Sequence, residues 1–80
     1  MTAHDTLIGV FASALCIPES PEIEQAEYRA IPQWDSVAHM RLVAAIETAF
    51  DIMLDTEDVI GMSSFAQAKN ILTKHGVHIA

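Results

Sequence analysis

The sequence of 80 residues contains one cysteine, Cys16, and only four basic side chains. A single cysteine cannot form an internal disulfide, which excludes the disulfide framework of a small secreted domain. Because its neighbours are apolar, we expect Cys16 to be a small buried residue. Eleven acidic residues give a formal net charge of −7. This balance argues against nucleic acid and favours partners with basic surfaces, although acidity by itself also keeps a small domain soluble.

Long apolar runs are also absent, and the start Met1-Thr2-Ala3-His4-Asp5 lacks the basic stretch of a secretion signal. We therefore expect no membrane span and a soluble, cytoplasmic protein. The length corresponds to one domain, 1–80, in which 51% hydrophobic residues can form a core. We expect this domain to be a monomer.

Apolar residues recur at helical spacing, and no alternating run indicates a sheet. The pattern predicts four helices, over about 3–15, from 35 or 36 to 50 or 51, over 56–60 and over about 64–74. Asp35, Asp55 and Ser64 are the expected N-caps, and Gly61 and Gly76 are expected to end the last two helices. The predicted fold is all-α, a four-helix bundle of three longer helices and one short helix.

A long loop, 16–35, connects the first two predicted helices. Connections of this length in a compact domain are functional, are disordered, or contain a short helical turn of their own. We expect Ile23, Tyr28 and Ile31 to anchor this loop across the core.

The second predicted helix carries apolar residues on two sides. A wheel at about 100° per residue places a broad core arc on one side, formed by Leu42, Val43, Ala45, Ile46, Ala49 and Phe50. An apolar stripe of Val37, Met40 and Ala44 lies on the other side, near Arg41 and Glu47. We predict that these five residues dock a partner protein. The alternatives are that exposed apolar residues are ordinary here, or that the long loop covers them.

Ser36 lies just before this stripe, in the first turn of the predicted helix. Free backbone N–H groups and the helix dipole at that end favour a phosphate group on its hydroxyl. Taken without its neighbours, Ser36 would be an ordinary capping serine.

Three segments follow one another around and after Ser36: Trp34-Asp35-Ser36-Val37, Leu42-Val43, and Ile46-Glu47-x-x-Phe50-Asp51-Ile52. Leu54-Asp55-x-Glu57-Asp58-Val59 and Ser63-Ser64-Phe65-Ala66 come next. This ordered set, over about 34–72, resembles the acyl carrier protein family. In that family Asp-Ser-Leu opens the second helix, and a short acidic third helix precedes a fourth that begins at Ser or Thr. Val37 stands where the family usually has Leu.

The resemblance implies that Ser36 is the attachment point of 4′-phosphopantetheine, transferred from coenzyme A by a phosphopantetheinyl transferase. It implies that Asp35 helps the transferase engage its metal and coenzyme A. The arm would carry acyl or aminoacyl groups as thioesters, received from an activating ligase and passed to acyl-transfer enzymes. The protein itself would not be an enzyme, because the chemistry belongs to the arm and to its partners.

Ala38, Arg41 and Thr48 stand where carriers of fatty-acid synthesis often have acidic residues. Arg41 would repel a basic docking surface. The segment Trp34-Asp35-Ser36-Val37-Ala38-His39 is more similar to specialised free-standing carriers, some of which serve amino-acid-activating ligases or secondary-metabolite pathways.

Other functions fit the sequence less well. Ser36 and His39 could suggest a nucleophile and its base, but no orienting acid or oxyanion site accompanies them. We expect His39 to contact a partner or the loop. The competing function is a helical interaction domain that binds proteins through the second helix and carries no cargo.

We predict no metal site. His75 and His78 are far from Cys16 in the sequence and lack further ligands, so we expect them to lie in a polar tail. Acidic residues at 51, 55, 57 and 58 lack the spacing of a calcium loop, and we expect them to form a solvated acidic face.

Overall fold

The computed structural model describes residues 2–79. In chain order its elements are α1 Ala3–Leu15, the 3-10 helix η1 Pro21–Gln25, α2 Ser36–Phe50, α3 Thr56–Gly61 and α4 Phe65–Lys74. No strand occurs within residues 2–79. The predicted all-α class is confirmed, with three longer helices, one short helix and a short helical turn within the long loop.

The helices begin at the predicted capping residues. Oδ1 of Asp35 accepts a hydrogen bond from the Ala38 N–H at 2.9 Å, and the Ser64 hydroxyl accepts one from the Gln67 N–H at 3.0 Å. At α3, Asp55 and Asp58 form a reciprocal capping box. These contacts satisfy N–H groups that the first turn of a helix leaves without a partner.

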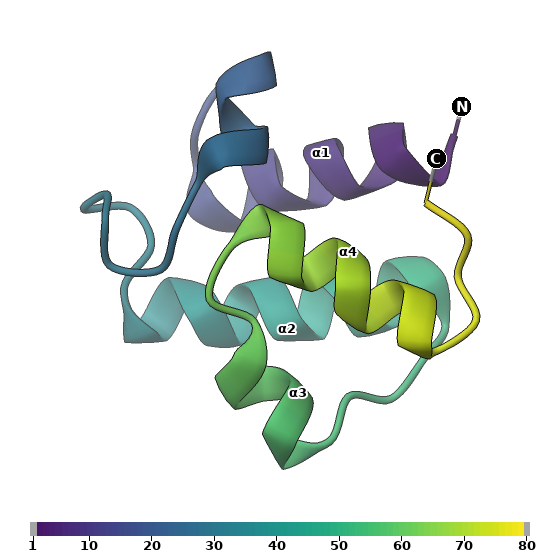
Figure 1. Cartoon of the computed structure of the whole chain (residues 1–80). Helices are drawn as coiled ribbons and strands as arrows, with labels where there is room; N and C mark the ends of the chain where they lie inside the picture. The colour runs from purple at the N-terminus through teal and green to yellow at the C-terminus, as the bar shows by residue number, and fades with distance from the viewer. Residues whose placement is uncertain (1, 80) are drawn as a thin grey trace.

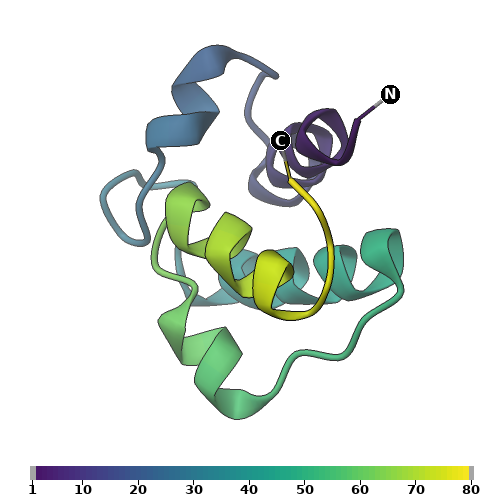
Figure 2. The same cartoon turned by 45° about the vertical axis from the view of Figure 1, so that its right-hand side comes forward.

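Helices α1 and α2 make the most extensive contact between two elements. In both views of the fold, α4 lies close to α2, and α3 lies on the side of the molecule away from α1 (Figures 1 and 2). The largest fully buried side chains between these elements are Trp34, Phe11, Phe65, Leu7, Leu15, Leu42, Ile46, Met62 and Leu72. Phe11 is central, because its ring packs edge-on against both Trp34 and Phe65.

The long loop is anchored in the way the sequence predicts. Ile23 is buried, and Tyr28 and Ile31 are half-buried against the core. The loop also pairs with the connection between α3 and α4, where the Tyr28 N–H donates to the Ser63 carbonyl at 2.8 Å. Trp34, near the end of the loop, has no exposed surface.

The structure corrects the predicted core face of α2 at two positions. Leu42, Val43 and Ile46 are buried as predicted, but Ala49 is exposed near the end of the helix. Ala38 is buried instead, because it precedes Leu42 and Ile46 at intervals of four residues along one face of the helix. An acidic side chain at position 38 would therefore not reach a docking partner.

The expected burial of Cys16 is also wrong. The chain takes a left-handed conformation there, with φ of 56°, and Cys16 becomes the exposed C-cap of α1. Its backbone N–H donates to carbonyl groups of the last turn, so its backbone ends the helix while its side chain stays outside the core.

Polar contacts attach α3 to the rest of the fold. Asp58, the buried residue of this helix, is 2% exposed and accepts hydrogen bonds from Lys74 and from His75, the latter at 2.7 Å. The expected solvated acidic face is therefore wrong at Asp58, and the expected polar tail is wrong at His75. Both expectations failed because the partners come together only when α4 folds back beside α3.

Asp58 makes the stability of the fold sensitive to acid. Hydrogen bonds from Lys74 and then from His75 lower the Asp58 pKa from 3.8 to about 2. A lowered pKa means that the ionised carboxylate stabilises the folded state above the unfolded pKa, and that this contribution disappears as pH falls from about 4 to about 2. Asp58→Asn should lower the free energy of unfolding at pH 7 and remove this part of its pH dependence. Urea unfolding at pH 7, 4 and 2.5 measures both effects.

Glu57→Gln is the matched control, because Glu57 lies beside Asp58 in α3 but is exposed. It should change the urea midpoint little at any of the three pH values. Equal effects of the two substitutions would contradict a specific role for the buried carboxylate.

Within residues 2–79, no helix combines the length and the apolar character that crossing a membrane requires.

Candidate functional site

Ser36 is the exposed first residue of α2. Two residues earlier, Trp34 is fully buried, and a compact turn precedes it in which the Trp34 N–H donates to Ile31 and the Trp34 carbonyl accepts from Arg29. Asp35 then caps the helix. The buried indole on one side and the capped helix on the other hold Ser36 in a defined position at the surface.

Tyr28 contacts Ser36 from the loop. Its hydroxyl oxygen lies 3.1 Å from Oγ of Ser36, a distance at which either hydroxyl can be the donor. The Tyr28 ring is half-buried, with centroid distances of 6.1 Å to Trp34 and 5.0 Å to His39. The position of the phenol is therefore determined by packed rings and by its backbone contact with Ser63.

His39 links three parts of the structure. The indole N–H of Trp34 donates to Nδ1 of His39 at 3.0 Å, and Nε2 of His39 lies 2.8 Å from the Val59 carbonyl. Because an indole N–H only donates and a carbonyl only accepts, the neutral imidazole with its proton on Nε2 satisfies both contacts. Both ring nitrogens are thus used within the fold, and His39 contacts the loop and α3 rather than serving as a base for Ser36.

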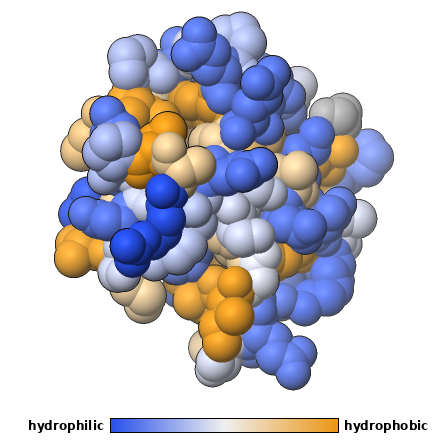
Figure 3. All heavy atoms as spheres, turned by 60° about the vertical axis from the view of Figure 1, so that its left-hand side comes forward, coloured by the Kyte–Doolittle hydropathy of each residue, from blue (hydrophilic) through white to orange (hydrophobic). Residues whose placement is uncertain are grey.

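The apolar stripe beside Ser36 is open. Val37 and Met40 are 65% and 59% exposed, and Ala44 is also exposed. Together with Ser36 and Arg41 they line a shallow hollow of about 620 Å³. The alternative that the long loop covers the stripe is therefore wrong. On the face of the molecule that Figure 3 shows, apolar patches are separated by polar side chains.

Two of the predicted docking residues also have contacts within the fold. The Arg41 Nε–H donates to the Ala14 carbonyl at 3.3 Å, close to the end of α1, where positive charge is favourable. The Glu47 carboxylate accepts a hydrogen bond from the Leu54 N–H at 2.9 Å and is half-buried. Arg41 remains exposed beside the stripe, whereas the Glu47 contact positions the connection from α2 to α3.

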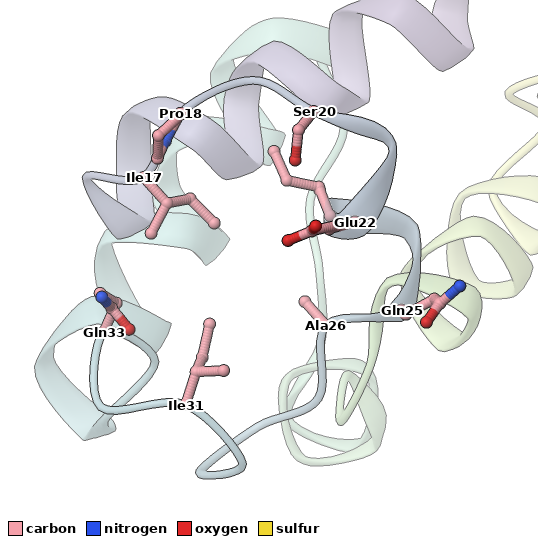
Figure 4. Close-up of a pocket in the computed structure, with 9 residues that line it drawn as sticks. Ile17, Pro18, Ser20, Glu22, Gln25, Ala26, Ile31 and Gln33 are labelled. Atoms are coloured by element: carbon pink, nitrogen blue, oxygen red, sulfur yellow. The ribbon is translucent and has the colours of Figure 1, made fainter.

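A second hollow, of about 490 Å³, is lined by η1 and by the parts of the 16–35 loop on either side of it. Ile17 and Ile31 point into it, and Glu22 is its one charged lining residue (Figure 4). Nothing in this lining pairs a nucleophile with a base. Among the described residues, no group of three or more His, Cys, Asp or Glu side chains could hold a metal ion.

Sequence reasoning missed the hydroxyl contact between Tyr28 and Ser36 and the contact of His39 with the Val59 carbonyl, whereas the expected contact of His39 with the loop is found at Trp34. The sequence predicts that Tyr28 anchors the loop, and an anchoring tyrosine usually finds a polar partner for its hydroxyl. That signal indicates that a partner exists, but the sequence alone does not indicate Ser36.

No family model matches the chain, and searches among curated proteins and among solved structures found no match.

Proposed function

We propose that this protein is a carrier that holds acyl or aminoacyl groups on a 4′-phosphopantetheine arm attached to Ser36. We also propose that its helices form the four-helix bundle of acyl carrier proteins. The observation that supports this function best is the setting of Ser36, an exposed hydroxyl at the start of a capped helix and next to an open apolar stripe.

The residues at this end of α2 fit a phosphodiester. The N–H groups of Ala38 and His39 are taken by the side chain and the carbonyl of Asp35. The N–H groups of Ser36 and Val37, at the first two positions of the helix, have no partner within the helix. Such groups and the helix dipole favour a negative charge on Ser36. Only Oδ1 of Asp35 takes part in the cap, which leaves Oδ2 for the role in transferase recognition that the family resemblance implies.

Loading would make Ser36 the nucleophile. Its Oγ–H bond breaks, Oγ forms a bond to the phosphorus that carries the pantetheine, and the P–O bond to the adenosine bisphosphate of coenzyme A breaks. The adenosine bisphosphate leaves with that electron pair, and the serine proton passes to solvent or to a base of the transferase. Once attached, the arm would supply a thiol that holds cargo as a thioester. The chain itself then presents the cargo and is not an enzyme.

The proposed partners are a phosphopantetheinyl transferase, an acyl- or aminoacyl-activating ligase and acyl-transfer enzymes. Val37, Met40 and Ala44 offer them an apolar contact, and Arg41 places a positive charge at its edge. The net charge of −7 would attract basic partner surfaces, whereas Arg41 would select against those that place a cation at this edge. This combination supports a specialised pathway, and we further propose that the carrier is cytoplasmic and monomeric.

A loading experiment tests the proposal. The protein is incubated with coenzyme A, magnesium and a broad-specificity phosphopantetheinyl transferase, and its intact mass is recorded. We expect a gain of one phosphopantetheine, and fragmentation of the loaded protein should place it on Ser36. No gain with both this transferase and further transferases, while circular dichroism shows a helical fold, would contradict the carrier function. Attachment to another hydroxyl would contradict the assigned site.

The second candidate function is a helical interaction domain without cargo. It is supported by the same open stripe, which a partner protein could contact whether or not Ser36 is modified. Only the carrier function requires the Ser36 hydroxyl, because the interaction domain would carry no cargo.

A further inference from the structure

We propose that the Tyr28 hydroxyl binds the phosphodiester on Ser36 and thereby couples loading of the carrier to the order of the 16–35 loop. This inference rests on the proposed carrier function and assigns to Tyr28 a positioning role at the root of the arm. Its basis is the contact of 3.1 Å between the hydroxyls of Tyr28 and Ser36, which come from the loop and from α2.

The Tyr28 hydroxyl is placed by several contacts at once. Its ring packs against Trp34 and His39, and His39 is itself held by Trp34 and Val59. The backbone of Tyr28 is bound to Ser63. A polar group positioned in this way loses little conformational freedom when it binds, so it is prepared for an acceptor at Ser36.

Loading changes the hydrogen bonding at this point. In the unloaded protein either hydroxyl can donate. In the loaded protein Oγ of Ser36 is an ester oxygen without a proton, so Tyr28 must be the donor. The two non-bridging oxygens of the phosphodiester are bonded to the same phosphorus as Oγ of Ser36. They share a negative charge. Hydrogen bonds to such acceptors are shorter and stronger than those between neutral hydroxyls.

The stronger bond would act on the loop, because Tyr28 lies in it. Residues 26–34 connect η1 to the turn before α2, and Tyr28 is also the point at which this segment pairs with the connection between α3 and α4. Loading should therefore slow the opening of the loop.

Tyr28→Phe tests this inference, since phenylalanine keeps the ring and removes only the hydroxyl. Wild type and variant are loaded, and complete loading is verified by intact mass. We expect the 31P resonance of the arm to differ between the two loaded proteins. Loading should slow amide hydrogen exchange over residues 26–34 of wild type by roughly threefold or more, and should have no such effect in Tyr28→Phe. Thr73→Val is the control, because the Thr73 hydroxyl bonds to Lys69 within α4, and it should behave as wild type.

A measurement on wild type needs no substitution. Tyr28 is the single tyrosine of the chain, so its Cζ resonance reports on its hydroxyl alone and should shift on loading. Two results would refute the role of Tyr28 while leaving the carrier function in place. The first is that wild type loads at Ser36 but the Cζ resonance does not shift. The second is that loaded Tyr28→Phe shows the same 31P resonance and the same loading-dependent protection as loaded wild type. If wild type does not load, the carrier function fails and the inference with it.

Discussion

Ser36→Ala should abolish attachment of the phosphopantetheine arm and leave the fold intact. The side chain is exposed, and its one hydrogen bond among residues 2–79 is the contact with Tyr28. Asp35, not Ser36, caps α2, and alanine is a good helix former. We therefore expect the free energy of unfolding to change by no more than about 1 kcal/mol. The loss of loading should be complete, since no other atom at that position can form the phosphoester bond.

Intact mass after incubation with coenzyme A and transferase measures the loss, and urea unfolding measures the stability. Ser13→Ala is the matched control, because Ser13 is also an exposed helical serine but lies in α1. It should load as wild type does. A Ser36→Ala protein that still gains one phosphopantetheine would show that another residue is the attachment point. If the variant instead gained no phosphopantetheine but retained every activity of the protein in its pathway, the interaction domain would be the better description.

The parts of this protein that could be predicted from sequence are those determined by neighbouring residues. Helix bounds and caps follow from local chemistry, and so the capping roles of Asp35, Asp55 and Ser64 are confirmed. The exposure of Val37 and Met40 follows from helical periodicity and is confirmed as well. The attachment role of Ser36 stays a prediction, because it rests on the resemblance of an ordered set of short segments.

Contacts between distant segments could not be predicted in the same way. Asp58 looks like one of several acidic residues on a solvated face, yet it is buried against two residues at the end of α4. The contact of His39 with the nearby loop residue Trp34 agrees with the sequence-based expectation, yet the second contact of its ring, with the Val59 carbonyl of α3, could not be predicted. In each case the sequence shows the polar group but not the partner that lies many residues away.

These unpredicted contacts explain how α3 keeps its place. A helix of six residues is too short to be stable without tertiary contacts, and Asp58 is its buried residue. Ile60 is 76% exposed, so apolar burial contributes little within the helix itself. The Asp58 contacts tie α3 to α4, and the bond between His39 and the Val59 carbonyl ties it to α2. Hydrogen bonds between polar groups are therefore the main contacts that hold α3 against α2 and α4.

His39→Leu should destabilise the protein by about 2–4 kcal/mol, because it leaves the buried indole N–H of Trp34 and the Val59 carbonyl without partners. Domains of this size have only several kcal/mol of stability, so the loss should be large in urea unfolding. Amide exchange in α3 should accelerate as well, since its attachment to α2 is removed. His78→Leu is the control, because His78 is exposed, and it should change stability little.

Asparagine and glutamine at position 39 can separate the two hydrogen bonds. The amide of asparagine reaches about as far as Nδ1 of histidine and can accept from the Trp34 indole, whereas the longer glutamine can place its amide N–H near the Val59 carbonyl. Each variant should recover part of the stability lost in His39→Leu, and only His39→Gln should restore slow amide exchange in α3. Recovery by asparagine alone would show that His39 acts through Trp34 and the position of Ser36. If neither variant is more stable than His39→Leu, the two hydrogen bonds do not account for the role of His39, and α3 must depend chiefly on Asp58.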